Sequence, residues 1–345
     1  MFLCEKKFLG EISLFELKNI VGNKNLILSI QKSIVQKRNF HSYIIHGKKN
    51  SGKLFLTNCL AKFILCQNEK KNHDVCNNCY SCHSFEEKNN PDIIYVRPTK
   101  TNFIAVDDIR EQIKEKANIK PYVCKYKIFI LEDADKMTLQ AQNALLKILE
   151  EPPSFVIFFL LGDDKKNFLP TIISRCAVLK TDLIDLQEIK NYLLENYKEK
   201  NESIIDVCCN YSGGNLGQAL ILLNDEIFFA LREKIIDFMI SLKKNNLAQA
   251  INFVKEFEMQ KENIDLIFDI IYSWFADLFF YSQTSEINFL KNPDKINQIQ
   301  KTCELYDSGI LYEKLKSVEK AKRYLGYNVN FKLDLTGFLI DLFLD

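Results

Sequence analysis

An apolar run, Tyr43-Ile-Ile-His46, leads directly into Gly47-Lys-Lys-Asn-Ser-Gly52-Lys53-Leu54, and a helix-forming stretch follows. This is the GxxxxGK spacing of a phosphate-binding loop, in which backbone N–H groups hold phosphates at the start of a helix and the lysine reaches the terminal phosphates. The position after the lysine normally carries a hydroxyl group that binds Mg²⁺, and Leu54 has no ligand atom. The loop therefore predicts a P-loop fold with poor nucleotide hydrolysis; the alternative is a glycine-rich turn that binds nothing. The candidate nucleotide contacts are Gly47, Ser51, Gly52 and Lys53.

Short apolar runs alternate with longer amphipathic stretches over the first half of the chain. This pattern is typical of a mostly parallel α/β sheet with helices on both faces. Strands are expected at Ser42–His46, Ile93–Val96, Lys127–Leu131, Phe155–Leu161 and Ala177–Leu179. Helices are expected at Leu54–Cys66, Val106–Lys116 and Thr138–Glu151, and Pro152-Pro153 ends the last of them.

The strand signal fades after about residue 182, and helical periodicity continues from there. Helices are expected at Leu186–Lys198, Ile204–Tyr211 and Gln218–Leu223, and a long helical pattern follows from about residue 227. The composition shifts near residues 182 and 227 therefore predict three domains, at residues 1–182, 183–226 and 227–345.

A second apolar run, Ile128-Phe-Ile-Leu131, ends in Glu132-Asp133-Ala-Asp135. In ATPases of this kind the strand usually ends in Asp-Glu, where Asp positions Mg²⁺ and Glu polarises the attacking water. The order is reversed here, so each side chain differs by one methylene group, and catalytic geometry is sensitive to shifts of about 1 Å. Glu132 and Asp133 therefore predict a degenerate nucleotide site; a solvated acidic turn is the alternative.

The 345 residues include 46 Lys and Arg against 45 Asp and Glu, which gives a formal net charge of +1. This balance argues against a protein that binds nucleic acid by bulk positive charge, although it allows a local basic face. No apolar run approaches the roughly 18–20 residues of a membrane span, and Met1–Lys7 lacks the pattern of a signal peptide. A cytoplasmic location is therefore expected, where a tight cysteine cluster indicates a metal site.

Such a cluster consists of Cys66 and, further on, Cys76-Asn-Asn-Cys79-Tyr-Ser-Cys82. Four thiolates with two CxxC steps can surround a tetrahedral Zn²⁺ ion, and sites of this type are structural. His73 and His83 are spare donors that a complete cysteine set does not need. An iron–sulfur cluster is the main alternative, although the Cys-Pro that ends its usual motif is absent. Unligated thiols are the third possibility.

Several motifs together carry a resemblance to a known family. The phosphate loop is followed by the four-cysteine segment, then by Asn143-Ala-Leu-Leu-Lys-Ile-Leu-Glu-Glu-Pro-Pro153 and Ser174-Arg175-Cys176. In this combination the chain resembles the clamp loader subunits of bacterial DNA polymerase III, members of the AAA+ superfamily, and it is most similar to the delta-prime type. Further matches lie at Ile20–Asn23, His41–Gly47, Pro91-Asp92 and, more weakly, Leu325–Leu333.

The resemblance implies a subunit that helps to load the sliding clamp onto primed DNA, within a DNA-directed DNA polymerase (nucleotidyltransferase) holoenzyme. The alternative is the gamma/tau type, the ATP-hydrolysing relative with the same zinc module. Gly162 stands where that relative tends to carry a polar sensor, and Gly217 where it has an arginine that contacts nucleotide. Together with Leu54 and the reversed acidic pair, these departures favour the delta-prime type and predict no ATPase activity of its own. Because Lys53 and the loop amides are intact, weak magnesium-independent ATP binding stays open.

Arg175, unlike the degenerate nucleotide site, is expected to take part in catalysis. In the family, the arginine of the Ser-Arg-Cys motif reaches the γ-phosphate of a neighbouring subunit, where a guanidinium neutralises developing charge. The resemblance therefore implies that Arg175 is catalytic in trans, as an arginine finger. The alternative is an arginine at the rim of a sheet that makes a surface ion pair.

For the whole chain, the resemblance implies a nucleotide-binding-like AAA+ domain with the zinc module at residues 66–82, a small helical lid over residues 183–226, and a helical collar over residues 227–345. The expected partners are gamma/tau- and delta-type subunits in a heteropentamer, the sliding clamp and, mainly through the assembled complex, primed DNA; no membrane contact is expected. The aromatic stripe over residues 274–280 is expected to be mostly domain core. A zinc-bearing scaffold unrelated to replication is the remaining alternative.

Overall fold

The structure, a computed structural model, describes residues 15–35, 40–68, 74–99, 103–241, 263–325, 337, 338 and 342. His73 and nearly all of the weaker match at Leu325–Leu333 lie outside the described residues. The chain divides into two compact units, residues 1–189 with 215–217 (unit 1) and residues 190–214 with 218–345 (unit 2). The three-domain division, with boundaries near 182 and 227, stays a prediction.

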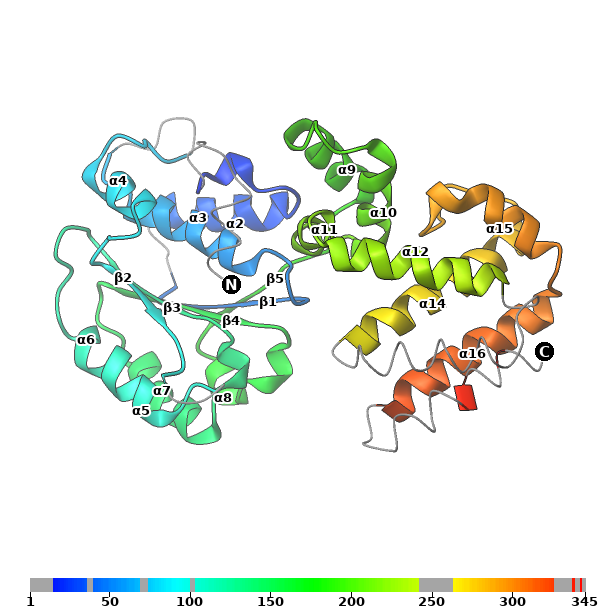
Figure 1. Cartoon of the computed structure of the whole chain (residues 1–345). Helices are drawn as coiled ribbons and strands as arrows, with labels where there is room; N and C mark the ends of the chain where they lie inside the picture. Colours follow the sequence, from blue (N-terminus) through cyan, green and yellow to red (C-terminus); the bar gives the residue numbers. More distant parts are fainter. Residues whose placement is uncertain are drawn as a thin grey trace. The chain divides into compact units, whose positions relative to one another are not determined.

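A five-stranded parallel sheet forms the centre of unit 1, in the order β2-β3-β4-β1-β5 (Figure 1). Its strands are β1 Ser42–His46, β2 Ile93–Val96, β3 Lys127–Leu131, β4 Val156–Gly162 and β5 Ala177–Lys180. The expected α/β fold is confirmed, with β4 beginning one residue later than predicted. Since the strands are parallel, their carboxyl ends meet at one edge of the sheet, which is where open α/β sheets bind ligands.

The helices of unit 1 are α2 Lys24–Val35, α3 Lys53–Leu65, α4 Tyr80–Glu86, α5 Val106–Ile109, α6 Glu115–Ala117, α7 Leu139–Glu150 and α8 Pro170–Ile173. Short 3₁₀ turns lie at η1 Leu17–Asn19, η4 Ala134–Lys136 and η5 Lys165–Asn167. A π-helical turn, η3 Arg110–Lys114, joins α5 to α6, so the helix expected over residues 106–116 is interrupted in its middle. Thr138 caps α7 by accepting a hydrogen bond from the N–H of Ala141 at 3.2 Å.

Both faces of the sheet are covered, which explains why the strands are apolar throughout instead of alternating. Successive side chains of a strand point to opposite faces. Ile45 and Phe159 therefore belong to the core formed with α2, α3 and α4, whereas Ile44 and Phe158 belong to the core formed with α5, α7 and α8. Figure 1 shows these two groups of helices on opposite sides of the sheet.

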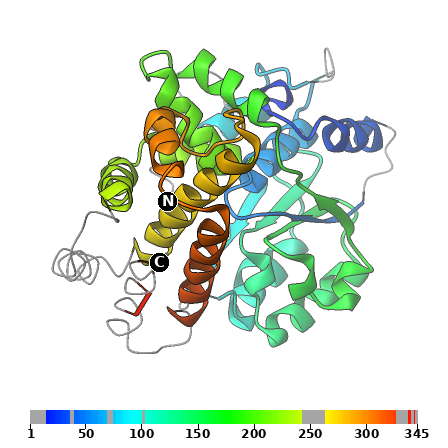
Figure 2. The ribbon, with the colours of Figure 1, turned by 90° about the vertical axis from the view of Figure 1, so that its right-hand side faces the viewer.

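The described part of unit 2 is helical. Its helices are α10 Glu202–Ser212, α12 Glu226–Ser241, α14 Ile264–Thr284, α15 Ile296–Cys303 and α16 Ser308–Leu325, with the turn η8 Pro293–Lys295; α9 Leu186–Asn196 and α11 Leu216–Leu223 begin in unit 1. α14 packs against α12, α15 and α16, and Figure 2 shows α14 and α16 side by side. Trp274, Phe275 and Leu278 are buried, so this part of the aromatic stripe is core, as expected. None of the described helices is long and apolar enough to cross a membrane.

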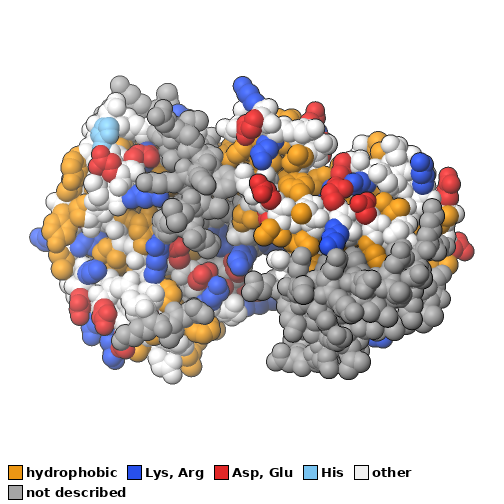
Figure 3. All heavy atoms as spheres, in the orientation of Figure 1, with side chains coloured by type: hydrophobic (Ala, Val, Ile, Leu, Met, Phe, Trp, Pro, Cys, Tyr) orange, Lys and Arg blue, Asp and Glu red, His pale blue; other side chains and the backbone are white. Residues whose placement is uncertain are grey.

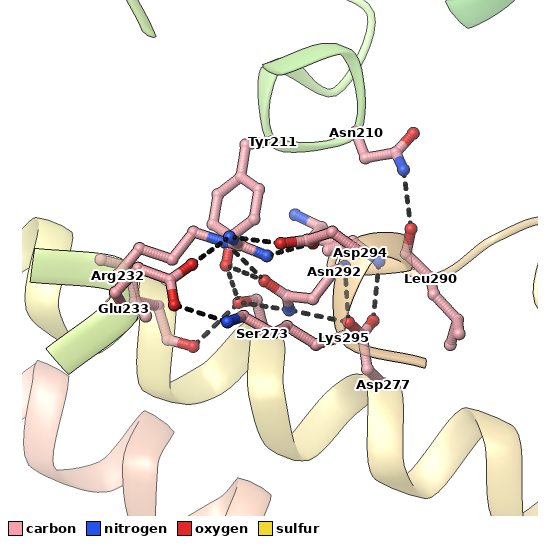
Figure 4. A network of polar contacts seen from close by, with 12 residues as sticks. Asn210, Tyr211, Arg232, Glu233, Ser273, Asp277, Leu290, Asn292, Asp294 and Lys295 are labelled. Atoms are coloured by element: carbon pink, nitrogen blue, oxygen red, sulfur yellow. Dashed lines mark hydrogen bonds and ion pairs between the residues drawn. The ribbon is translucent and has the colours of Figure 1, made fainter. Parts of the chain in front are cut away.

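A buried polar cluster joins α10, α12, α14 and η8 in unit 2 (Figure 4). The side chain of Arg232 is only 2% exposed; its Nη1 lies 3.0 Å from Asp294 Oδ2, and its Nε donates to Asn292 Oδ1 at 2.9 Å. The hydroxyl of Tyr211 donates to the same Asn292 oxygen at 2.9 Å, and Asn292 Nδ2 donates to Asp277 at 2.7 Å. Because buried polar groups need partners with good geometry, this cluster fixes how these four elements pack.

Charged side chains of both signs are interspersed over the described surface in the view of Figure 3, without a large field of one sign. This distribution agrees with the formal net charge of +1. It gives no support to nucleic-acid binding by bulk charge on this face.

Candidate functional site: a P-loop with internal partners

The P-loop follows β1, which lies between β4 and β5 in the sheet. Gly52, at the start of α3, has φ +75°, in the left-handed region that glycine adopts without strain. A Cβ atom at Gly47 would lie 2.0 Å from Thr181 Oγ1, so the close approach of the loop to the end of β5 requires glycine there. Ser51 Oγ and Thr181 Oγ1 are 3.0 Å apart, which fastens the loop to the same residue.

Lys53, the P-loop lysine, has three acceptors within the chain. Its Nζ donates to the carbonyl oxygens of Gly47 and Lys48 at 2.8 and 2.9 Å. The third acceptor is Oδ1 of Asp163, the residue that follows β4, at 2.8 Å. The ammonium group is therefore paired with a carboxylate at the place where a P-loop lysine binds phosphate. The next residue, Leu54, is partly buried and packs against the apolar core on the α3 side of the sheet.

The acidic pair after β3 is directed elsewhere. Glu132 accepts hydrogen bonds from Arg97 Nε at 3.1 Å and Nη2 at 2.7 Å. Arg97 follows β2, which lies on the far side of β3 from the P-loop strand β1. Asp133 is exposed, has φ +50° and lies 3.3 Å from Lys136 Nζ. Each carboxylate thus has a cation of its own chain, and neither has a hydrogen bond or ion pair with Lys53 among the contacts of the described residues.

Asp135 holds the loop that contains Asp163, a role that sequence reasoning missed. Its side chain is buried, and its Oδ2 accepts the N–H groups of Asp163 and Asp164 at 2.9 and 3.4 Å. A Cβ atom at Gly162 would lie 2.8 Å from the Cβ of Asp135. Gly162 therefore allows β4 to end against Asp135. In the sequence, only the glycine at the position of a polar sensor pointed to this close approach.

Gly217 packs directly on the P-loop within unit 1. A Cβ atom at this position would lie 2.1 Å from the backbone oxygen of Asn50. Nearby, Asn215 Nδ2 donates to the backbone oxygen of Lys49 at 2.7 Å. An arginine at position 217 is incompatible with this arrangement, because its Cβ alone would displace the loop backbone.

Arg175 lies on the surface, just after α8. Its Nη1 donates to the backbone oxygen of Thr171 at 2.9 Å and to Ser174 Oγ at 3.3 Å. Its Nη2 donates to Glu150 Oε1 at 2.9 Å, and the two side chains are 36% and 51% exposed. The surface ion pair considered as the alternative is thus present, and it leaves the guanidinium accessible to solvent.

The four predicted cysteine ligands come together in unit 1. The Sγ atoms of Cys66, Cys76, Cys79 and Cys82 all lie within 4.8 Å of one another, and those of Cys76 and Cys82 are 3.9 Å apart. Zinc–sulfur bonds of about 2.3 Å in a tetrahedron place sulfur atoms about 3.8 Å apart, so the residues fit such an ion. Cys66 ends α3 and Cys79 precedes α4, so two helix ends position the cluster.

The thiols of this cluster have different electrostatic surroundings. Burial raises the pKa of Cys66 and of Cys82. Burial acts in the same direction on Cys76, but hydrogen bonds from the backbone of Asn78 and from neighbouring cysteines outweigh it and lower the pKa of Cys76 to about 6. The cluster therefore contains a thiol that readily forms the thiolate a metal needs. Of the other cysteines in the described part of the chain, Cys59, Cys124, Cys208 and Cys209 are buried, whereas Cys176 and Cys303 are only partly buried.

The cysteine segment is fastened to the rest of unit 1 on both sides. Lys62 of α3, 1% exposed, donates to Asn77 Oδ1 at 2.8 Å and forms an ion pair with Glu86 of α4. Asp74 accepts the N–H groups of Leu17 and Lys18, each at 3.2 Å. These bonds hold the CxxC steps near Cys66.

Two family models described as DNA polymerase III, delta subunit, match this chain, one over residues 22–184 and a C-terminal one over residues 228–342. The chain belongs to the DNA polymerase III delta subunit family. Family relatives include DNA polymerase III subunit delta' of Bacillus subtilis, 25% identical over 307 residues, with 87% of this chain and 90% of the relative covered. The delta' subunit of Buchnera aphidicola subsp. Acyrthosiphon pisum is 28% identical over 295 residues, with 83% and 84% covered.

DNA polymerase III subunit tau of Bacillus subtilis is 26% identical over 326 residues, which cover 88% of this chain and 57% of the relative. The gamma/tau subunit of Mycoplasma genitalium is 26% identical over 301 residues, with 81% of this chain and 49% of the relative covered. The chain thus spans about half the length of these gamma/tau relatives and most of the length of the delta' relatives.

Proposed function

We propose that this protein is a delta-prime-type clamp loader subunit of DNA polymerase III that does not hydrolyse ATP and supplies Arg175 to a neighbouring ATPase subunit. Membership in the delta subunit family supports the polymerase III context. Two delta' relatives that match over 84% or more of their own length support the delta-prime type.

The observation that carries the non-hydrolysing role is the set of acceptors around Lys53. Two carbonyl oxygens and Asp163 occupy its Nζ at 2.8–2.9 Å, so a nucleotide phosphate has to replace a carboxylate. Three further features act in the same direction: Leu54 offers no Mg²⁺ ligand, Glu132 is bound to Arg97, and Gly217 leaves no room for a side chain. Hydrolysis needs a positioned Mg²⁺ and a positioned water. Leu54 and the engaged Glu132 weaken the Mg²⁺ site, and Gly217 excludes an arginine contact to the nucleotide.

Turnover by the isolated protein tests this role. We expect the purified chain with Mg²⁺ and ATP to release phosphate no faster than a Lys53→Ala variant of the same protein. Brisk magnesium-dependent hydrolysis that Lys53→Ala abolishes would reject the proposal and favour a motor subunit.

Arg175 supports the role in trans because it is exposed and lies at the surface just after α8. A guanidinium brought to the γ-phosphate of a neighbouring nucleotide stabilises the charge that develops in phosphoryl transfer, and such fingers are worth roughly 10³–10⁵ in rate. We expect a loader reconstituted with Arg175→Ala to assemble normally and to lose most of its DNA-stimulated ATPase and clamp-loading activity. An Arg110→Ala loader is the control, because Arg110 lies outside the proposed collar, is 64% exposed and forms a long ion pair with Asp107, at 3.5 Å. Unchanged ATPase in the Arg175 variant would contradict the assignment.

A second candidate is the gamma/tau-type motor. It is favoured by the match to the tau subunit of Bacillus subtilis over 88% of this chain and by the intact glycines and lysine of the P-loop. The turnover measurement on the isolated chain separates the two candidates.

For the cysteine cluster we propose structural Zn²⁺, held by Cys66, Cys76, Cys79 and Cys82. A bound ion would crosslink the end of α3 to the start of α4, and it supplies no catalytic chemistry there because all four positions around it are filled by sulfur. We expect one zinc per chain by elemental analysis. Iron with visible absorption would favour the iron–sulfur alternative, and a metal-free folded protein would favour unligated thiols.

The proposed partners are gamma/tau- and delta-type subunits in a heteropentamer, the sliding clamp and primed DNA reached mainly through the assembled complex. The family supports this set, with residues 183–226 as the lid and residues 227–345 as the collar that joins the subunits. We expect the chain to co-purify with both subunit types. Failure to do so would favour the scaffold unrelated to replication.

A further inference from the structure

Glu150 is a charged residue next to the proposed finger for which the proposed function gives no role. It is the last residue of α7, and Pro152-Pro153 prevent the helix from continuing past it. Its Oε1 accepts a hydrogen bond from Arg175 Nη2 at 2.9 Å. The motif that ends α7 and the Ser-Arg-Cys motif, far apart in the sequence, therefore meet in one ion pair.

Two further hydrogen bonds fix the direction of the Arg175 guanidinium: its Nη1 donates to the backbone oxygen of Thr171 at 2.9 Å and to Ser174 Oγ at 3.3 Å. A guanidinium has five N–H donors, and three of them are used in these contacts. Two donors, at Nε and Nη2, are left without an acceptor in the described part of the chain. Because Arg175 is held by one oxygen of Glu150 and not by both, part of its donor face stays available for a phosphate.

The elements that carry the pair are themselves fastened to each other. Gln142, buried in α7, accepts the N–H of Leu169 with Oε1 at 2.8 Å and donates from Nε2 to the backbone oxygen of Asn167 at 3.1 Å. Leu169 is the residue that precedes α8. These two hydrogen bonds hold α7 against the segment that leads into α8, so the backbone that carries Glu150 is tied to the backbone that carries Arg175.

We infer that Glu150 is a positioning residue for Arg175. It orients the guanidinium so that the two unused N–H donors can reach the γ-phosphate of the nucleotide bound by the neighbouring subunit. This inference rests on the proposed role of Arg175 in trans. A long exposed side chain samples several rotamers, and a displacement of about 1 Å from productive geometry can cost up to roughly 100-fold in rate. Glu150 reduces that sampling before the subunits meet.

The test is steady-state ATPase kinetics of the loader reconstituted with Glu150→Ala. We expect kcat to fall by roughly tenfold, with KM for ATP unchanged, because the arginine acts on the transition state and the nucleotide is bound by the neighbour. Glu150→Gln keeps an oxygen acceptor for Arg175 and should retain most of the activity. Glu151→Ala, at the adjacent exposed position, is the matched control and should behave as the unmodified loader.

A double variant separates positioning from general structural damage. If Glu150 acts through Arg175, adding Glu150→Ala to Arg175→Ala should cause no further loss of kcat. An additive loss, an unchanged kcat in Glu150→Ala, or a faster loader would overturn the inference. If Arg175→Ala itself leaves the ATPase unchanged, the proposed function fails; if Arg175→Ala is inactive and Glu150→Ala is fully active, only the role of Glu150 fails.

Discussion

Replacement of Asp163 by asparagine removes the negative charge beside the P-loop lysine and keeps the size of the side chain. Lys53 Nζ lies 2.8 Å from Asp163 Oδ1, with the two side chains 12% and 40% exposed. At an effective dielectric constant of about 20 the bare attraction over this distance is roughly 6 kcal/mol. Since Asp163 is well solvated, solvent screening and the cost of removing both charges from water reduce the net value to about 1 kcal/mol.

An anion that binds the P-loop competes with Asp163 for Lys53, so it should gain this 1 kcal/mol in the Asp163→Asn variant. We expect the affinity for ADP without Mg²⁺ to rise about fivefold, measured by calorimetric titration of the isolated protein. Asp164→Asn is the control, because the Asp164 side chain accepts a bond from the Lys166 N–H at 2.9 Å and is not paired with Lys53. The reasoning is refuted if the Asp163 variant binds ADP no more tightly than the unmodified protein, or if neither binds it.

Three further predictions concern stability. If the cysteine cluster holds zinc, a strong chelator or Cys79→Ser should lower the melting temperature, since a structural metal site contributes directly to folding. Asp294→Ala should lower the free energy of unfolding in urea by about 3 kcal/mol, because the buried charge of Arg232 loses its closer ion-pair partner and keeps only the longer contact with Glu233, at 3.5 Å. Gly217→Ala should lower it by about 1–3 kcal/mol, because the added Cβ would lie 2.1 Å from the backbone oxygen of Asn50.

Each of these has an outcome that would contradict it. A chelator that leaves the melting temperature unchanged would mean that no bound metal stabilises unit 1. Asp265→Ala, in the first turn of α14, is the control for the Asp294 variant; equal effects of the two would mean that burial of Arg232 does not set the cost. For Gly217, a substitution that leaves the free energy of unfolding in urea unchanged would show that the P-loop backbone moves freely at Asn50.

Local patterns were sufficient for the elements of unit 1. The strands β1, β2 and β3 lie at the predicted residues, because a fully buried parallel strand is a short apolar run bounded by loop residues, and this is visible without any tertiary contact. The four-cysteine cluster was equally predictable, since the spacing of its two CxxC steps restricts where the thiols can lie. The π-helical turn at Arg110–Lys114 was not, because its apolar spacing is that of an ordinary helix.

The partners of the charged groups depend on the folded chain. Lys53 and Asp163 are 110 residues apart and Arg175 and Glu150 are 25 apart; no periodicity or motif spacing relates them. Lys53 and Asp163 meet because parallel strands bring the loops that follow them to one edge of the sheet, in an order set by the topology and not by the sequence. Glu150 and Arg175 instead precede β4 and β5, and they meet at the edge where those strands begin. The amino-acid pattern therefore specified the strands, the P-loop and the cysteine cluster, whereas the fold specified which carboxylate faces each cation, because ion pairs form between groups that packing brings within a few ångströms of each other.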